Sequence, residues 1–304
     1  MALHYRSAAL MRAAAPWSRA AAAVALAGCR GLTDPPLPAG AERFAPLPVY
    51  ARWWAMVEAC AGETRPLGDV AWYRAPGATS VPAGRGGAVT GYWSRPGNRI
   101  VLAGFYAEDG GLVRHEMLHA LVRERGHPRD VFLGRCAGVA PCQDECVRDA
   151  GPAPAPDPAA VRVPPSALEV TAEVRPAAPD RAADDGHCTL TVRVRNPAPR
   201  PVLVSLPAAG ASGADQGLRY EYEVSWARGQ LFGGAGIDDP TGPGFAAGEA
   251  RVYVFDFSVA PAAAAGVGRL PGRGWTLALG PGRYALTGVY AGRRSDPVAV
   301  AVGP

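Results

Sequence analysis

Two histidines separated by three residues constrain the fold of this chain most strongly. His115 and His119 stand four residues apart, and Glu116 directly follows the first of them. On an α-helix, residues at this spacing lie one turn apart on the same face, which is the geometry that two imidazoles need to share one metal ion. The pattern therefore predicts a helix that carries a metal site, with Glu116 placed to act on a metal-bound water.

The residues that flank this segment indicate where the helix begins and ends. Asp109 can cap a helix whose first turn contains Gly110 and whose body runs to about Arg125. Gly126 follows, at the position where a left-handed residue commonly ends a helix and turns the chain. That turn can bring His127 back towards the metal.

The residues before this helix predict a small α+β domain, which we place at residues 49–148. Residues 49–60 have the apolar spacing of an amphipathic helix, and Gly62 ends it. We expect its paired tryptophans, Trp53 and Trp54, in the core. Three short apolar runs, separated by Pro and Gly clusters, then predict a small, largely antiparallel sheet: residues 70–74, 88–93 and 99–103.

A Pro- and Ala-rich run at residues 151–158 separates two modules. Such a run is stiff and extended, so we place a linker at residues 149–165. Beyond it, short alternating runs with turn residues between them predict an antiparallel sandwich over residues 166–304. The runs at 191–197 and 280–288 look like immunoglobulin-like envelope domains, a resemblance that implies fold only. The expected strands are residues 168–174, 188–194, 202–206, 220–226, 251–257, 275–279, 282–290 and 298–302.

The amino-terminal residues predict export and a lipid anchor. Arg12 and Arg19 precede a short apolar run, residues 20–26, which small residues follow. This order is typical of a secretory signal, assigned here to residues 1–28, and residues 29–48 then form a tether. The small residues directly before Cys29 resemble the lipobox of bacterial lipoproteins, and the resemblance implies that Cys29 is acylated. We therefore expect a protein of the bacterial cell envelope that lies outside the cytoplasm and is held at a membrane by lipid.

The remaining cysteines favour disulfides, because an oxidising envelope permits them. Five is an odd number, so one cysteine stays free or pairs with another chain. Our best pairing is Cys60 with Cys136, and the alternative is a structural zinc site that includes the clustered cysteines. The five are Cys60, Cys136, Cys142, Cys146 and Cys188.

The charge of the chain does not indicate a nucleic-acid surface. Its net charge is +4, its 31 basic residues are all arginine, and these arginines are scattered along the sequence. Basic residues that bind nucleic acid are usually clustered on one face or along one helix. We therefore expect no nucleic-acid partner.

The sequence from His115 to His119 resembles the active-site helix of zincin metallopeptidases. The resemblance covers about residues 49–147 and implies an α+β zincin-like domain ahead of the all-β immunoglobulin-like sandwich. It also implies that His115 and His119 bind Zn²⁺, that Glu116 is the catalytic base, and that peptide binds as an added strand beside the sheet.

The third ligand departs from the better-known zincin patterns. The metzincin arrangement would place Gly and His at the positions that Val122 and Arg125 occupy. The SprT-like group has a His and then an aromatic residue after the helix, and His127 with Phe132 is similar in order. We favour His127 over a downstream carboxylate. The competing carboxylates are Glu145 above all, then Asp144 and Asp130.

These patterns predict a zinc-dependent hydrolase of peptides or proteins at the cell envelope. An oxyanion stabiliser is required, and Tyr92, Tyr106 and Arg114 are the candidates nearest in sequence. The alternative is a non-catalytic envelope lipoprotein whose β-sandwich recognises a protein or a glycan. A third hypothesis is that the sandwich gates the metal site.

Overall fold

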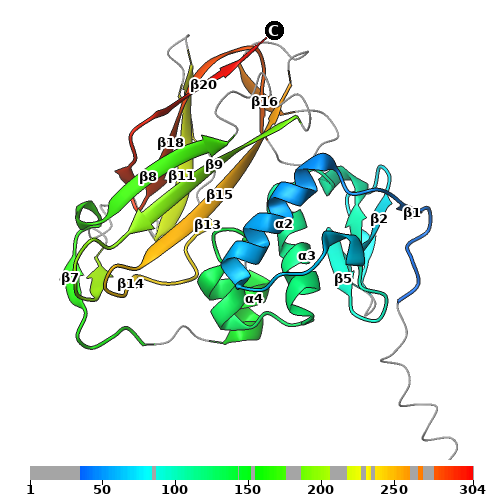
Figure 1. Cartoon of the computed structure of the whole chain (residues 1–304), viewed down its shortest axis with the longest axis horizontal. Helices are drawn as coiled ribbons and strands as arrows, with labels where there is room; N and C mark the ends of the chain where they lie inside the picture. The colour runs from blue at the N-terminus through cyan, green and yellow to red at the C-terminus, as the bar shows by residue number, and fades with distance from the viewer. Residues whose placement is uncertain are drawn as a thin grey trace, which may run out of the picture. The chain divides into compact units, whose positions relative to one another are not determined.

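The structure is a computed structural model of the whole chain. It describes residues 35–83, 87–142, 144–151, 155–175, 186–205, 218–226, 231–233, 237–260, 266–269 and 277–303, so the expected signal peptide and Cys29 lie outside it. Pro36–Pro304 form one compact unit, a mixed α/β fold made mostly of strands in several sheets, with few helices (Figure 1). Among the helices that the structure describes, none has the length and apolar content needed to cross a bilayer.

The first long helix, α2 (Pro48–Ala61), supports the core around the histidines. A proline at its first position suits the helix start, where no backbone donor is needed. Gly62 ends it with φ 72°, and the Gly62 N–H donates to the carbonyl of Glu58 at 2.9 Å. Trp53 and Trp54 are 0% and 4% exposed, which confirms that they belong to the core.

A four-stranded sheet lies beside α2 and α3, with strand order β1-β2-β6-β5. We expected a largely antiparallel sheet, and the central β2–β6 pair is parallel, while its two flanking pairs are antiparallel. The pair is parallel because the chain crosses over between the two strands through β3, β4 and β5. The elements are β1 (Glu42–Arg43), η2 (Leu67–Asp69), β2 (Ala71–Ala75), β3 (Val81–Pro82), β4 (Ala88–Val89), β5 (Gly91–Ser94), β6 (Arg99–Ala103) and η3 (Gly104–Tyr106).

The histidine helix, α3, spans Gly110–Val122. As expected, Asp109 caps it, and its Oδ1 accepts the N–H of Leu112 at 3.0 Å. The expected end was wrong, because the left-handed residue is Arg123, with φ 58°, and not Gly126. The early end has a physical reason: the carbonyl of Glu124 turns back to accept a hydrogen bond from the His119 ring, which a helix continuing to Arg125 would prevent.

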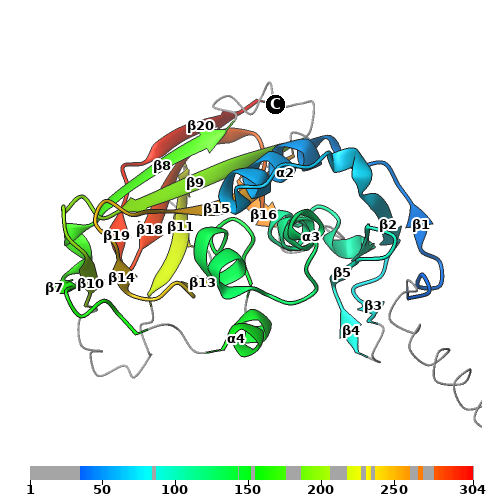
Figure 2. The same cartoon turned by 60° about the horizontal axis from the view of Figure 1, so that its bottom comes forward.

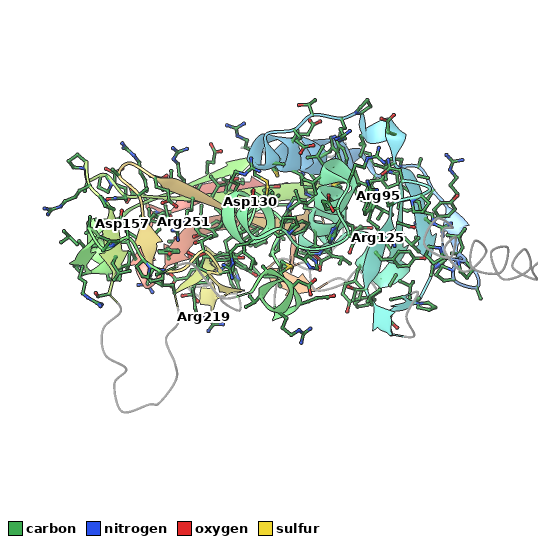
Figure 3. All side chains as sticks on the ribbon, turned by 90° about the horizontal axis from the view of Figure 1, so that it is seen from below. Arg95, Arg125, Asp130, Asp157, Arg219 and Arg251 are labelled. Atoms are coloured by element: carbon green, nitrogen blue, oxygen red, sulfur yellow. A yellow bond between two sulfur atoms is a disulfide. The ribbon has the colours of Figure 1, made fainter. Side chains whose placement is uncertain are left out.

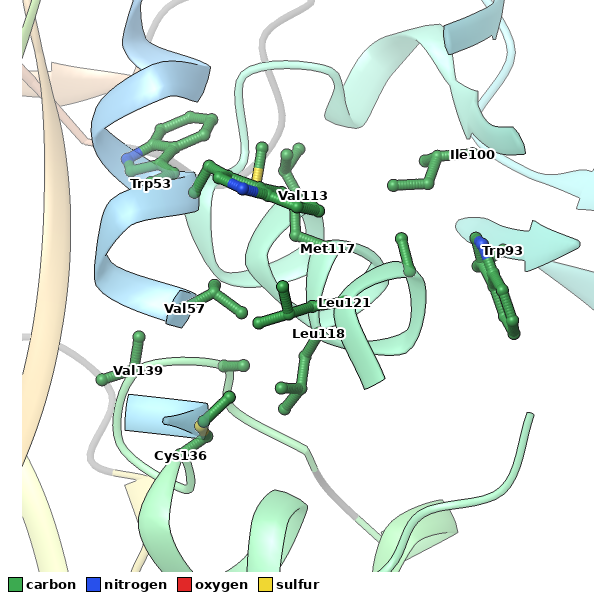
Figure 4. Close-up of a cluster of buried hydrophobic side chains, with 14 of the residues drawn as sticks. Trp53, Val57, Trp93, Ile100, Val113, Met117, Leu118, Leu121, Cys136 and Val139 are labelled. Carbon is green, nitrogen blue, oxygen red and sulfur yellow. The ribbon is translucent and has the colours of Figure 1, made fainter. Parts of the chain in front are cut away.

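The core around α3 joins the helices to the small sheet. Figure 4 shows Val57 of α2 beside Met117 and Leu121 of α3, with Trp93 and Ile100 on the side of the sheet. Four of these side chains are fully buried, and Trp93 is 7% exposed. This packing fixes which face of α3 is turned inwards and leaves the histidine face for the site.

Two disulfides hold the segment after α3. Cys60 pairs with Cys136, which is the pair expected from the sequence, and Cys142 pairs with Cys146. Cys188 is buried in β9 (His187–Arg195). The segment contains the short π-helix η4 (Val131–Arg135) and the helix α4 (Asp144–Ala150).

The carboxyl-terminal half is built from strands, and each of the eight expected runs contains one. A five-stranded sheet, β16-β17-β15-β9-β8, and a six-stranded sheet built on β11 and β18 share one apolar core. The bounds are β7 (Val161–Val163), η5 (Pro165–Ala167), β8 (Glu169–Arg175), β9 (His187–Arg195), β10 (Val202–Val204), β11 (Arg219–Trp226), β12 (Leu231–Gly233), β13 (Ile237–Asp238), β14 (Gly244–Phe245), β15 (Ala250–Val259), β16 (Val267–Arg269), β17 (Leu277–Leu279), β18 (Gly282–Tyr290), β19 (Arg293–Arg294) and β20 (Val298–Val302).

Strand β15 belongs to both halves of the compact unit, and Figure 2 shows it beside α2. Its Val254 lies in the core around α3, and the Val254 N–H donates to the carbonyl of Gly138 at 2.9 Å. Two residues further along β15, Asp256 forms an ion pair with Arg114 of α3, and both side chains are at most 4% exposed. The histidine helix is therefore packed directly against the β-rich half.

Candidate metal centre

Three histidine side chains meet at the carboxyl-terminal end of α3. His115 Nε2 lies 3.2 Å from His119 Nε2 and 3.4 Å from His127 Nε2. His119 and His127 are buried and His115 is partly buried. The structure thus brings together the two helix histidines and the loop histidine that the sequence favoured as the third ligand.

Hydrogen bonds to the other ring nitrogens orient two of these imidazoles. His119 Nδ1 lies 2.7 Å from the carbonyl oxygen of Glu124, and His127 Nδ1 lies 2.7 Å from Asp149 Oδ2. Because both partners accept hydrogen bonds, each Nδ1 carries a proton and each ring turns its Nε2 inwards. A carboxylate or carbonyl behind a histidine is the usual arrangement at protein metal sites.

The spacing of the Nε2 atoms fits a metal ion between them. Zinc binds imidazole nitrogen at about 2.0–2.1 Å, so two ligands of a tetrahedral site lie about 3.3–3.4 Å apart. The distances from His115 Nε2 to His119 Nε2 and His127 Nε2 are 3.2 and 3.4 Å. Lone pairs that face one another at this range repel, and a cation between them removes that repulsion.

Aromatic rings enclose the histidines. The Phe132 ring is fully buried, and its centroid lies 5.4, 4.6 and 5.0 Å from the rings of His115, His119 and His127. The Trp93 ring lies parallel to that of His119, with centroids 6.5 Å apart. These apolar walls exclude water and strengthen electrostatic interactions inside the site.

The protonation behaviour of the metal-free histidines follows from this enclosure. Burial lowers the pKa of His119 to about 4, against the opposing effect of its bond to Glu124. Burial and the neighbouring imidazoles also hold the pKa of His115 well below its usual value. Both rings are therefore neutral at pH 7, the form that binds metal.

Glu116 belongs to α3, and its side chain lies against the edge strand β5. Its carboxylate accepts the backbone N–H of Trp93, and Gly91 lies against its side chain. Burial raises the pKa of Glu116 to about 8, with a smaller contribution from the negative charge of Glu145. A buried carboxyl group whose pKa lies near neutral pH is suited to exchange protons with a reacting group.

The carboxylates considered as rival third ligands lie elsewhere, as far as the structure describes them. Asp130, labelled in Figure 3, is 77% exposed and lies 3.8 Å from Arg135. Glu145 is exposed, and the structure does not describe the side chain of Asp144. His127 therefore has the geometry of a third ligand, whereas Glu145 acts on the site at longer range, through its charge.

The cysteines after η4 reach the same centre. The ligand atoms of His115, His127, Cys142 and Cys146 all lie within 4.8 Å of one another, so this His/Cys cluster could hold a metal ion. In this structure the two cysteines are paired as a disulfide. The sequence had shown the cysteine cluster without its proximity to the histidines.

The three candidate oxyanion stabilisers do not join the histidines. The guanidinium of Arg114 is committed to Asp256 and to the carbonyl of Val139. Tyr92 and Tyr106 pack with the small cluster of Ala75, Val81 and Ala103, on the sheet face opposite α3. We correct this expectation for Arg114, because its charge pairs within the protein core.

Asp149 is the partner of the histidine cluster that sequence reasoning missed. It lies 22 residues after His127 on α4, and no local spacing connects the two. His187 is buried in β9, where its ring lies 5.6 Å from that of Trp53, apart from the metal cluster.

Comparisons with known proteins give little to add to this geometry. No protein-family model matches the chain, and no curated protein matches it. Among solved structures, it matches an alkylpurine DNA glycosylase, AlkC of Pseudomonas fluorescens, bound to DNA that contains an abasic site analog. The match has a TM-score of 0.24 and 13% identity, and covers 45% of this chain and 31% of the glycosylase chain.

This match corrects one expectation from the sequence. The matched glycosylase is bound to DNA, so the exclusion of a nucleic-acid partner is withdrawn. A TM-score of 0.24 is too low to show a shared fold, and the match assigns no activity to this chain.

Proposed function

We propose that this chain is a zinc-dependent hydrolase of peptides, with His115, His119 and His127 as metal ligands and Glu116 as the proton-transfer residue. The observation that carries the proposal is the convergence of the histidine Nε2 atoms, at 3.2 and 3.4 Å from His115, beside a buried glutamate on the same helix. Three protein ligands leave a fourth position open for water, as catalytic zinc sites do.

The chemistry divides between the metal and the protein. A zinc ion held by the three histidines would supply Lewis-acid chemistry, lowering the pKa of a bound water to about 7 so that a nucleophile is available at neutral pH. In its ionised form Glu116 would take a proton from the attacking water and pass it to the leaving amine, and a cation held by the histidines would lower the pKa of Glu116 and favour that form. The hydrogen bonds from His119 to Glu124 and from His127 to Asp149 hold both rings with Nε2 turned towards the site, and Phe132 and Trp93 keep bulk water away.

The edge strand β5 supports a peptide as the substrate class. β5 is the terminal strand of its sheet, and it packs beside α3 next to Glu116. An extended peptide can therefore add to the sheet at β5 through backbone hydrogen bonds, which would place one of its carbonyl groups near the metal.

The finer fold belongs to the same proposal: a zincin-like domain followed by an immunoglobulin-like sandwich. Helix α3 beside a sheet with an antiparallel edge strand supports the first part. For the second, Tyr284 OH donates to the carbonyl of Gly280 at 2.6 Å, four residues upstream, and two sheets share one core. A tyrosine bonded in this way to the backbone is a feature of immunoglobulin-like sandwiches.

The rival function is a non-catalytic binding lipoprotein, and a cavity favours it. A cavity of about 1010 Å³ lies between η4 and β15, lined mainly by apolar groups together with charged side chains such as Arg129 and Arg251. None of the three histidines lines it. In this alternative the metal is structural and the β-rich half binds a protein or a glycan.

Glu116→Gln separates the two functions. We expect the purified protein to hold one tightly bound zinc per chain, and the variant to keep that zinc while losing peptide hydrolysis by at least a hundredfold. His119→Ala should lose both the zinc and the hydrolysis. Equal hydrolysis by Glu116→Gln, or a wild-type protein that takes up no zinc, would refute the enzyme.

The cellular location is a separate proposal. We infer that the chain is exported and acylated on Cys29, which lies outside the described residues. The Cys60–Cys136 disulfide supports export, because disulfides persist in oxidising compartments. Labelling of the cell-expressed protein with a fatty-acid analogue should occur in wild type and be absent in Cys29→Ser.

A further inference from the structure

The cysteine pair beside the metal centre has no part in the proposed hydrolysis. Cys142 precedes α4 and Cys146 lies within it, and their sulfur atoms share a 4.8 Å cluster with the ligand nitrogens of His115 and His127. His119 is outside that cluster. The centre therefore offers two overlapping sets of ligands, which have His115 and His127 in common.

The two sets differ in the coordination that they leave to a metal ion. Three histidines leave one position for water, whereas two histidines and two thiolates fill all four positions of a tetrahedral zinc ion. With zinc–sulfur bonds of about 2.3 Å, the ligand atoms of such a site lie about 3.3–3.8 Å apart. The sulfur–nitrogen distances, all within 4.8 Å, therefore need only a small adjustment, while the two sulfur atoms move apart once the disulfide is reduced. A closed set of this kind is typical of structural zinc.

The oxidation state of the pair decides which set is available. A disulfide sulfur is no longer a thiolate, and the thiolate is the form that binds zinc. The Cys142–Cys146 disulfide therefore leaves the ion to the histidines.

We propose that Cys142 and Cys146 form a redox-controlled second ligand pair. As a disulfide they leave the metal centre open to water, and as thiolates they close it by completing a ligand set with His115 and His127. The proximity of the two histidines and two cysteines supports the closed ligand set by itself. The effect of that set on hydrolysis rests on the function proposed above. His119 would leave the metal in the reduced form, and its Nδ1 remains bonded to Glu124.

A dithiol can reduce the Cys142–Cys146 disulfide by thiol–disulfide exchange. Cys142 is partly exposed and Cys146 is buried, so a thiolate of the reductant attacks Cys142 Sγ and the Cys146 thiolate leaves. The second thiol of the reductant then displaces Cys142 and closes its own disulfide. Two electrons and two protons pass to the cysteines, and both protons are released to solvent when zinc binds the thiolates.

Cobalt in place of zinc tests the ligand set directly. The full chain is reduced with a water-soluble phosphine, which is removed before one equivalent of Co²⁺ is added, and its spectrum is compared with that of the oxidised protein. Thiolate ligation predicts a near-ultraviolet sulfur-to-cobalt charge-transfer band in the reduced form alone. The band should disappear when the protein is reoxidised.

Two variants identify the responsible cysteines. Cys142→Ser/Cys146→Ser should lose the band and the response of the protein to reductant. The matched variant Cys60→Ser/Cys136→Ser keeps the pair beside the histidines and should keep both. If a variant does not fold, modification of the wild-type thiols decides: zinc should slow the reaction of the two reduced cysteines with a thiol reagent at least tenfold.

The outcomes separate this inference from the proposed function. A charge-transfer band in the reduced protein supports the thiolate ligands even if the oxidised protein hydrolyses no peptide. If hydrolysis occurs, it should fall at least tenfold on reduction and return on reoxidation. The inference is overturned if the reduced protein gives no band and zinc leaves the thiol reaction rate unchanged.

Discussion

The buried ion pair between α3 and β15 gives the sharpest stability prediction. Asp256 accepts from Arg114, from Trp53 Nε1 at 2.9 Å and from Thr189 Oγ1 at 3.1 Å, with both charged side chains almost fully buried. Asp256→Asn keeps the size of the side chain and removes its charge, so the buried Arg114 guanidinium loses its ion-pair partner and keeps only the longer-range charge of Asp109. Breaking a buried pair in this way costs about 3–5 kcal/mol.

The assay is urea unfolding of the metal-free protein at pH 7, with both disulfides kept oxidised and tryptophan fluorescence as the signal. Metal is removed because zinc bound to the native state would add to the apparent stability. We expect Asp256→Asn to lower the free energy of unfolding by about 3–5 kcal/mol. The shift should appear as a lower midpoint with an unchanged slope.

A double-mutant cycle shows whether the charge is the cause. Arg114→Met removes the buried cation, so adding Asp256→Asn to that variant should cost much less than it costs the wild type, and the coupling energy should exceed about 2 kcal/mol. The reasoning fails if Asp256→Asn alone costs less than about 1 kcal/mol. It also fails if the cost is the same with and without Arg114.

Three further predictions concern the metal centre and its support. Asp149→Asn should weaken zinc affinity by about 10–100-fold in a metal titration, because the carboxylate behind His127 orients that ligand, and an unchanged affinity would contradict this role. Opening Cys60–Cys136 by replacing both cysteines with serine should lower the free energy of unfolding by about 4 kcal/mol, because the bond closes a loop with a sequence separation of 76. The contribution of His119 to the stability of the metal-free protein should fall by on the order of 3 kcal/mol as the pH drops from 6.5 towards 4, because its folded pKa lies below its unfolded value and the unfolded chain binds the proton first. The raised pKa of Glu116 acts in the opposite direction, so the measurement is the difference between the urea-unfolding profiles of wild type and His119→Gln, and a difference that does not change with pH would exclude His119.

The parts of the fold that follow from local pattern were predictable. The helix that carries the histidines and the cap at Asp109 both depend on residues within one or two turns. The strands of the β-rich half follow from alternation over a few residues. The direction of the β2–β6 pair was not predictable from the runs themselves, because the connection between two strands decides it.

Only part of the candidate metal centre could be predicted from the sequence, because some of its residues are far apart along the chain. His115, Glu116 and His119 share one helix, so their spacing alone places them together. The ring partner Asp149 comes from another helix, and the counter-ion Asp256 lies 142 residues from Arg114. Such pairs depend on tertiary packing, which spacing along the chain does not encode.

The dual role of β15 limits how this protein can be divided or recombined. A chain that stops near Pro158 would lack Val254 and Asp256, and so would leave a gap in the core of α3 and a buried arginine without its partner. Loss of zinc binding by such a fragment would report a damaged helix, with no bearing on whether the β-rich half gates the site. For the same reason, a β-rich half taken from another protein would serve here only if it also supplied an acceptor for Arg114, so the two halves can be exchanged only as a matched set.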